Sequence, residues 1–206
     1  MKVLLVNGSP KPKGNTYDSL TEIANTLEKQ GIETEIFQLG SKPISGCIAC
    51  SKCRETKRCI IDDKVNEFLE KVDTMDGFIF GSPVHFAGLS GALTSFLDRV
   101  FYSNMTGFRG KPAAGIVVCR RGGASASFDQ LNKYFTICQM PIVSSNYWNT
   151  VHAHAPGETK EDVEGLQTMR VIGDNMSWLL KCIEAGKIAG INMPEQEKRA
   201  WTNFIR

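Results

Sequence analysis

Short apolar runs alternate with amphipathic segments along most of the chain. An uninterrupted apolar run is typical of a strand buried on both faces, whereas apolar residues at intervals of three and four predict a helix with one buried face. The pattern predicts strands at Lys2–Val6, Glu33–Leu39, Gly77–Gly81, Ala113–Cys119 and Ile142–Ser145. It predicts helices at Thr16–Gln30, Asp63–Thr74, Leu89–Phe101, Ser127–Gln139 and about Lys160–Ala185. Residues Gly40–Ile61 follow neither period.

Strands and helices that alternate in this way indicate an α/β fold. Parallel neighbours need crossover connections, so we expect a doubly wound, five-stranded parallel sheet between two layers of helices. In such folds a ligand binds beyond the carboxyl ends of the strands, near the point where the strand order reverses. The loops that begin at Asn7, Ser82 and Arg120 follow the first, third and fourth predicted strands. We therefore expect these loops to carry the functional site.

The composition is that of an ordinary globular domain. The 206 residues include 24 Lys and Arg against 22 Asp and Glu, and 42% are hydrophobic. A net charge of +2 is too small to indicate a nucleic-acid partner or an acidic membrane surface. Only four apolar residues, Val3–Val6, follow Met1 and Lys2, which is unlike a signal peptide, and no apolar stretch is long enough to span a bilayer. We therefore expect a single domain over residues 1–206, located in the cytoplasm.

The loop between the first predicted strand and helix has features of an anion site. It reads NGSPKPKGNT over residues 7–16. Ser9, Asn15 and Thr16 offer hydroxyl and amide groups, Lys11 adds positive charge, and the helix start provides free N–H groups and a positive dipole end. These features suit a phosphate monoester, although the spacing is neither that of a Walker loop nor that of a dinucleotide turn. A plain polar turn with a helix cap at Asn15 explains the composition equally well.

Four of the seven cysteines lie in a cysteine-rich loop that we define as residues 44–62. Cys47, Cys50, Cys53 and Cys59 have the spacing C-x2-C-x2-C-x5-C. In a reducing compartment such a group indicates metal or redox chemistry before disulfides. Structural zinc more often uses two separate knuckles, so a [4Fe–4S] cluster ranks above zinc, with a reduced or disulfide-linked loop as an alternative of equal weight. The remaining cysteines, which we interpret as core residues, are Cys119, Cys138 and Cys182.

Two segments together resemble a known family. The sequence VNGSP at residues 6–10, followed by GNT at 14–16, looks like the FMN-phosphate loop of the NADPH-dependent FMN reductase and iron–sulfur flavoprotein families. The segment GSPVHF at 81–86, followed by FLDR at 96–99, is similar to their second flavin loop and its helix. The likeness extends over most of the chain. It implies a flavodoxin-like fold with FMN as cofactor, its phosphate held by Ser9, Lys11, Asn15 and Thr16.

The resemblance places the backbone of residues 83–86 along the isoalloxazine ring. Pro83 stiffens the turn, and Val84 and Phe86 would present an apolar wall to the flavin. His85 stands where many relatives carry tyrosine, so it would either tune the flavin and assist proton delivery or be an ordinary, partly exposed loop residue. The chemistry itself belongs to FMN, and no other side chain is expected to be catalytic.

The loop after the fourth predicted strand offers a third group of contacts. Gly122 and Gly123 permit close approach of the backbone to a ring edge, and Arg120 can stabilise negative charge on a reduced flavin. The aromatic segment 146–157 is long for a connector, and it would cover the flavin, admit a nicotinamide or form a subunit contact. Its two histidines have no carboxylate partner nearby in the sequence and are not assigned as ligands.

The leading functional hypothesis is an FMN-dependent oxidoreductase that uses NAD(P)H to reduce a flavin, a quinone or a similar small-molecule acceptor. The alternative is an iron–sulfur flavoprotein that passes electrons between a [4Fe–4S] cluster, FMN and a ferredoxin-like partner. The cysteine spacing is similar to the cluster motif of the second family, although related reductases keep several of these cysteines without needing a cluster. The resemblance also implies a homodimer or homotetramer.

Overall fold

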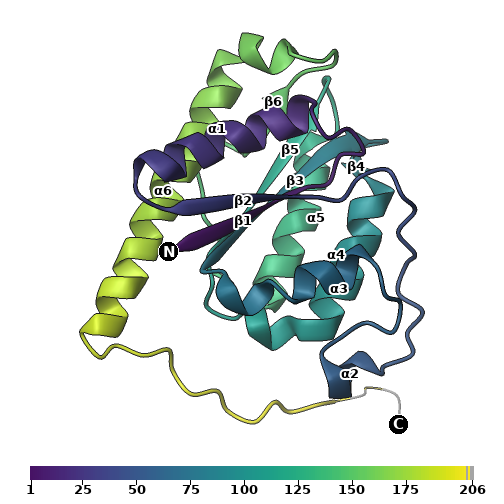
Figure 1. Ribbon diagram of the computed structural model, residues 1–206, viewed down its shortest axis with the longest axis vertical. Helices are drawn as coiled ribbons and strands as arrows, with labels where there is room; N and C mark the ends of the chain where they lie inside the picture. The colour runs from purple at the N-terminus through teal and green to yellow at the C-terminus, as the bar shows by residue number, and fades with distance from the viewer. Residues whose placement is uncertain (203, 205–206) are drawn as a thin grey trace.

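A parallel β-sheet forms the centre of the molecule. The computed structural model describes residues 1–202 and 204, and positions 203 and 205–206 of the predicted domain lie outside the described residues. The parallel strands run in the order β2-β1-β3-β5-β6 (Figure 1). They are β1 (Lys2–Asn7), β2 (Glu33–Gln38), β3 (Gly77–His85), β5 (Ala113–Cys119) and β6 (Thr150–His152). The number of parallel strands in the described residues is the expected five, and a short strand, β4 (Gly88–Leu89), pairs antiparallel with the end of β3.

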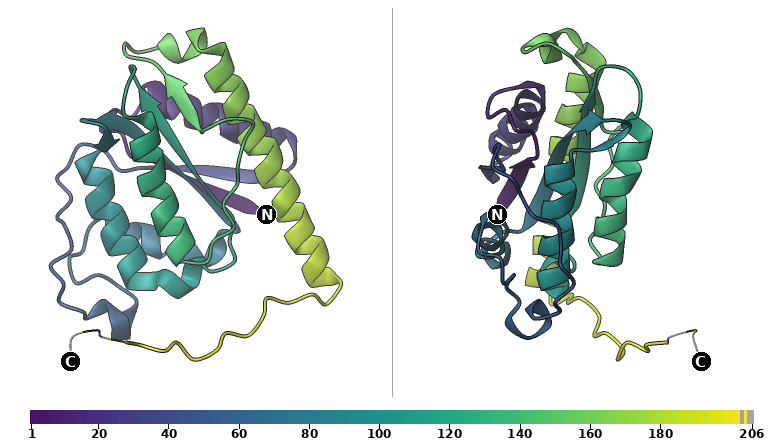
Figure 2. Two further views of the ribbon diagram at one scale, coloured as in Figure 1. Left: turned by 180° about the vertical axis from the view of Figure 1, so that it is seen from behind. Right: turned by 90° about the vertical axis from the view of Figure 1, so that its right-hand side faces the viewer.

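Helices cover both faces of the sheet, which gives the predicted three-layer α/β/α, flavodoxin-like architecture (Figure 2). On one face lie α1 (Asn15–Lys29) and α6 (Val163–Ile188), and on the other α3 (Lys64–Leu69), α4 (Gly91–Asn104) and α5 (Ala124–Ile137). Shorter turns are α2 (Cys53–Thr56) and the 3₁₀ segments Val72–Thr74, Met105–Phe108 and Glu158–Glu161. Successive side chains of a strand point to opposite faces, so each central strand serves both layers. Leu5 packs with the α1 and α6 side, whereas Leu4 packs with the other.

Phenylalanine side chains fix α4 against the sheet. The ring centroid of Phe68 in α3 lies 5.2 Å from that of Phe96 in α4 and 6.0 Å from that of Phe78 in β3. All three rings are fully buried. Burial of a side chain of this size contributes roughly 1.5–3 kcal/mol. This packing makes α4 a firm support, and both candidate sites described below contain residues from it or beside it.

The last predicted strand was wrong. Ile142 forms only an isolated bridge with Ala113, and the strand that pairs with β5 is β6, which lies inside the segment 146–157 expected as a loop. After the bridge the chain bends away from the sheet, because the Ser145 hydroxyl donates a hydrogen bond to the side chain of Asn149 at 2.7 Å. The chain returns to the sheet only beyond this turn.

The cysteines outside the cysteine-rich loop differ in burial. Cys119 and Cys138 are buried as expected, and burial raises the pKa of the Cys138 thiol to about 11. Cys182 was expected in the core, but it lies exposed on α6. Cys182 continues the apolar periodicity of this long helix, but the sheet covers only the opposite face of α6.

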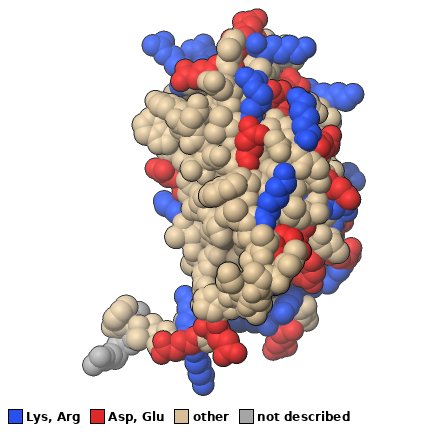
Figure 3. Space-filling model, turned by 90° about the vertical axis from the view of Figure 1, so that its left-hand side faces the viewer, with Lys and Arg blue, Asp and Glu red and all other residues tan. Residues whose placement is uncertain are grey.

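The surface combines charged and uncharged areas. Figure 3 shows a flank on which Lys, Arg, Asp and Glu gather toward one side and leave a broad area of other residues beside them. Beyond α6 the chain continues as an extended tail, which Arg109 contacts by donating a hydrogen bond to the carbonyl of Pro194 at 2.6 Å. Among the residues described, no helix combines the length and the apolar character needed to cross a membrane.

Candidate functional site

The loops after β1, β3 and β5 meet in one cleft at the carboxyl edge of the sheet. The cleft has a volume of about 370 Å³, and the segment after β6 forms its fourth wall. It lies where the strand order reverses, between β1 and β3. Its lining residues are Ser9, Pro10, Lys11, Gly14, Asn15, Thr16, Pro83, Val84, His85, Val118, Cys119, Arg120, Ala153 and His154. Most of the residues expected at the site are therefore brought together.

The loop after β1 is shaped by the buried side chain of Asn7. Its Nδ2 donates a hydrogen bond to the carbonyl of Lys11 at 3.3 Å, and its Oδ1 accepts the N–H of Ser9 at 3.1 Å. The Ser9 hydroxyl accepts the N–H of Lys11 at 3.2 Å, which leaves its own proton available to a ligand. Gly14 precedes α1 and has no side chain to cap it, so the first N–H groups of the helix remain free. Free N–H groups, a hydroxyl and a lysine on one wall suit an anion.

Gly8 and Ser90 lock the first loop against the second. The N–H of Gly8 donates to the carbonyl of Gly81 at 2.9 Å, and a Cβ on Gly8 would lie only 2.7 Å from that oxygen. This close approach of two backbones requires glycine. The Ser90 hydroxyl donates to the carbonyl of Gly8 at 2.9 Å, and the N–H of Ser90 donates to the Ser82 hydroxyl at 3.1 Å. The two walls are therefore fixed relative to each other by the protein alone.

The second loop is a tight hairpin between β3 and β4. Three of the expected residues, Pro83, Val84 and His85, line the cleft. The chain reverses at Phe86 and Ala87, whose φ angles of 49° and 59° are those of a two-residue hairpin turn. This turn puts Phe86 at the tip with its side chain fully exposed, so the apolar wall expected from Phe86 does not form in the structure.

The loop after β5 contributes Arg120 to the cleft, while Gly122 and Gly123 lie outside its lining. Gly123 has a φ of +88°, and a Cβ there would lie 2.5 Å from the Cα of Ala87. Its lack of a side chain therefore allows this loop to pack on the tip of the hairpin. In the structure Gly123 supports the second loop, and neither glycine forms the cleft surface.

Asn15 holds the fourth wall in place. Its Nδ2 donates to the carbonyl of Ala155 at 2.9 Å, and its Oδ1 accepts the N–H of Gly157 at 3.2 Å and the hydroxyl of Thr159 at 3.0 Å. The Asn15 side chain, which was expected to contact a phosphate, is thus hydrogen-bonded to segment 153–159. From the length and aromatic character of segment 146–157, a cover for the flavin was expected as one of three roles, but no single residue of the segment was assigned to the site.

Cys119 contributes an uncharged thiol to the cleft. Burial raises the pKa of this thiol, and the negative charge of Asp162 raises it further. Its Sγ lies 3.6 Å from Nδ1 of His152. The thiol is therefore protonated at neutral pH and adds no charge to the cleft.

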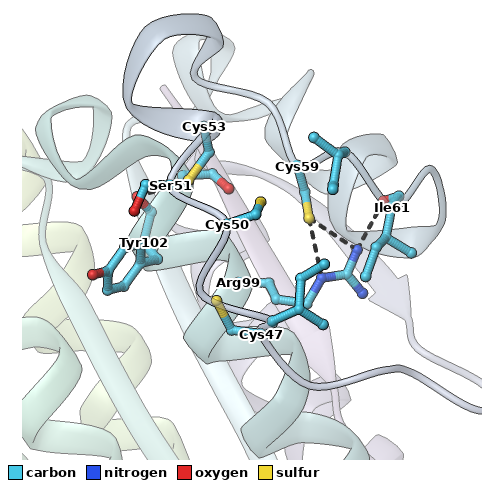
Figure 4. Close-up of a pocket in the computed structure, with 11 residues that line it drawn as sticks. Cys47, Cys50, Ser51, Cys53, Cys59, Ile61, Arg99 and Tyr102 are labelled. Atoms are coloured by element: carbon cyan, nitrogen blue, oxygen red, sulfur yellow. Dashed lines mark hydrogen bonds between the residues drawn. The ribbon is translucent and has the colours of Figure 1, made fainter.

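The four clustered cysteines surround a second pocket, beside the later turns of α4 (Figure 4). Cys47 and Cys50 are exposed, Cys53 is buried and Cys59 is half-buried. The Cys53 thiol donates a hydrogen bond to the carbonyl of Tyr102 at 3.7 Å. Across residues 1–202 and 204, no three cysteine, histidine or acidic side chains stand close enough to hold a metal ion. The fold therefore brings the thiols to one pocket without setting them in a ligand geometry.

Arg99 is a charged residue of this pocket that sequence reasoning did not assign to it. Its side chain is only 1% exposed and forms an ion pair with Asp63 at 2.7 Å. Its Nε and Nη2 each donate to Sγ of Cys59 at 3.3 Å. Burial lowers the pKa of Arg99, but hydrogen bonds with Asp63 and Cys59 outweigh burial and raise it. The available signal was an arginine on the buried stripe of a helix, three residues after Phe96.

Comparisons with known proteins agree with this architecture. A model of the family described as NADPH-dependent FMN reductase matches residues 1–155. An iron–sulfur flavoprotein of Methanocaldococcus jannaschii is 37% identical over 193 residues, which cover 89% of this chain and 100% of that protein. Another, from Methanosarcina thermophila, is 25% identical over 91% of this chain and 99% of its own length. The structure of a WrbA-like flavodoxin from Agrobacterium tumefaciens covers 88% of this chain and 96% of that one, with 16% identity and a TM-score of 0.59.

Proposed function

Because the chain belongs to the NADPH-dependent FMN reductase family and is a flavin-dependent oxidoreductase, we propose that FMN binds in the cleft between β1 and β3. NAD(P)H reduces it there, and a flavin, quinone or similar small molecule accepts the electrons. The observation that carries this proposal is the meeting of an anion-binding helix start with a rigid backbone hairpin in one cleft of about 370 Å³.

The lining residues fit the two ends of FMN. Ser9, Lys11 and Thr16 would hold the phosphate together with the first N–H groups of α1, and Asn15 would contribute its backbone while its side chain holds the fourth wall. The backbone of Pro83–His85 and the side chain of Arg120 would lie along the ring, and Gly123 would support the hairpin that carries Pro83–His85. Bound FMN supplies hydride and electron transfer, and the protein orients it and limits the access of water.

The cysteine pocket favours a second candidate function, that of an iron–sulfur electron carrier. Four thiols at one pocket are a suitable donor set for a [4Fe–4S] cluster, and the charge of Arg99 offsets that of the thiolates. Such a cluster exchanges single electrons when bound. The chain would then pass electrons between the cluster, FMN and a ferredoxin-like protein.

One preparation tests both candidates. The chain is purified without oxygen, and its flavin absorption, iron and sulfide are measured before NAD(P)H oxidation is followed with quinone, flavin or ferredoxin as acceptor. Flavin with NAD(P)H turnover supports the first candidate, and iron with ferredoxin-dependent transfer supports the second. A protein without flavin bands under all conditions would contradict the proposed cleft.

We further propose that the chain assembles as a homodimer or homotetramer, as the family resemblance implies. The broad area without charged side chains in Figure 3 supports an interface between copies. Sedimentation velocity of the FMN-loaded protein measures the mass, and a monomer at micromolar concentration would contradict this part of the proposal.

A further inference from the structure

Arg99 brings a buried charge to the pocket that the four cysteines line. We propose that Arg99 is a positioning residue that fixes Cys59 as a cluster ligand and raises the reduction potential of the cluster. The proposal rests on the second candidate function, because it requires a [4Fe–4S] cluster on the four cysteines.

The first observation is the geometry of the guanidinium against sulfur. Nε and Nη2 of Arg99 form the same edge of the planar group, and both point at Sγ of Cys59 at 3.3 Å (Figure 4). Two donors from one rigid fork define the position of the sulfur, which a lysine with a single flexible ammonium does not. Cys47 and Cys50 are exposed, and Cys53 contacts a carbonyl instead, so the cationic contact belongs to Cys59 alone among the four.

The second observation is that the guanidinium is itself held from its other sides. Nη1 and Nη2 donate to the two carboxylate oxygens of Asp63 at 2.7 and 2.9 Å. Nη2 also donates to the carbonyl of Ile61 at 2.8 Å, and Nη1 to that of Ser45 at 3.3 Å. Asp63 is fixed in turn, because its Oδ1 accepts the N–H of Val65 at the start of α3. The guanidinium therefore cannot turn away from the sulfur without breaking several of these hydrogen bonds.

The third step concerns energy. Removing a guanidinium from water is costly, and an apolar side chain would fill the same stripe of α4 without that cost. A cluster gains negative charge on reduction, and charged N–H···S bonds stabilise that added charge. Arg99 thus favours the reduced state and raises the potential, while the bonds around it keep Cys59 in place.

The test uses the full chain, loaded with FMN and reconstituted with iron and sulfide without oxygen. R99K keeps the charge but loses the fork, and R99Q/D63N removes both charges so that no carboxylate is left unpaired. R58Q is the matched control, because Arg58 adjoins Cys59 in sequence but is exposed and pairs with Asp62 and Glu70. An EPR-monitored redox titration gives the cluster potential, with the FMN potential as internal reference, and a chelator assay gives the rate of iron release.

We expect a lower cluster potential in both Arg99 variants, an unchanged FMN potential, and iron release about tenfold faster than in the parent and R58Q. A parent chain that takes up no iron overturns the second candidate function and this inference with it. A parent that holds the cluster while R99K and R99Q/D63N keep its potential overturns the role of Arg99 alone. Loss of FMN together with iron in both variants shows that Arg99 serves only the fold, and also overturns the inference.

Discussion

Asn15 ties the first turn of α1 to the segment that forms the fourth wall of the cleft. Replacing it with alanine removes three hydrogen bonds to residues 155–159, each worth about 0.5–1.5 kcal/mol. We expect N15A to bind FMN roughly tenfold more weakly, which corresponds to the loss of about one net hydrogen bond. Faster dissociation should account for the change, because the wall opens more often. Stopped-flow release of FMN measures it.

Riboflavin distinguishes this role from direct contact with phosphate, because it lacks the phosphate group. If Asn15 holds the wall, N15A loses affinity for riboflavin and FMN alike. A loss confined to FMN would instead identify the side chain as a phosphate ligand. N175A is the matched control, because it removes a half-buried amide that donates to the carbonyl of Ser144, and the affinity of this variant for FMN should not change.

Single residues of the cleft were predictable where they follow a strand end, and unpredictable where they depend on a distant partner. Ser9 and Pro83 follow within three residues of the predicted strands Lys2–Val6 and Gly77–Gly81, whose burial is visible in the sequence, so they fall at the predicted edge. Arg99 obtains its role from Asp63 and Cys59, and no local pattern links these three positions. The exposure of Phe86 was unpredictable for a related reason, since the geometry of the hairpin places its side chain at the tip.

At the scale of elements, long buried strands were recovered and the short edge strand was not. β5 has seven buried residues in succession, which is a clear signal. β6 has three residues, of which only Val151 is buried, and so shows no period. The apolar pair Ile142 and Val143 was a stronger signal, yet it reaches only the beginning of β5. Which of the two segments pairs is decided by Asn149, a residue that is not typical of strands.

Asn149 substitutes for a missing part of the edge strand. It is buried, and its Nδ2 donates to the carbonyl of Gly115 at 3.0 Å, while its own carbonyl accepts the N–H of Val117. Replacement by alanine leaves the Gly115 carbonyl buried without that donor, which costs about 1–3 kcal/mol. We expect N149A to lower the urea midpoint with the slope of unfolding unchanged.

S145A provides the comparison for this element. This substitution removes the hydroxyl that donates to Asn149. It leaves in place the hydrogen bond from the Asn149 side-chain amide to the carbonyl of Gly115. Its effect should remain below about 1 kcal/mol, since Ser145 is only half-buried and water can replace the contact. Equal effects of S145A and N149A would show that the turn, and not the bond to β5, fixes the edge of the sheet.

At the scale of the whole molecule, the alternation of strands and helices was enough to give the fold and the position of the cleft. A parallel doubly wound sheet has a reversal of strand order, and ligand loops gather there for topological reasons. The cysteine pocket was predicted from spacing as a set of four residues, but its position beside α4 was not. Residues 44–62 lack regular periodicity, so their location depends on contacts such as the one between Cys53 and Tyr102.

The cleft is built from four separate segments of chain, and a ligand that joins them should stabilise the whole domain. FMN at 100 times its dissociation constant adds about 2.7 kcal/mol to the free energy of unfolding. For a domain of this size, that raises the unfolding midpoint by roughly 5–10 °C. Scanning calorimetry of the chain with and without FMN measures the difference. At the same FMN concentration, the midpoint of S9A/T16A should rise less, because each substitution removes a hydroxyl from the proposed phosphate wall. A rise equal to that of the parent would place the phosphate elsewhere.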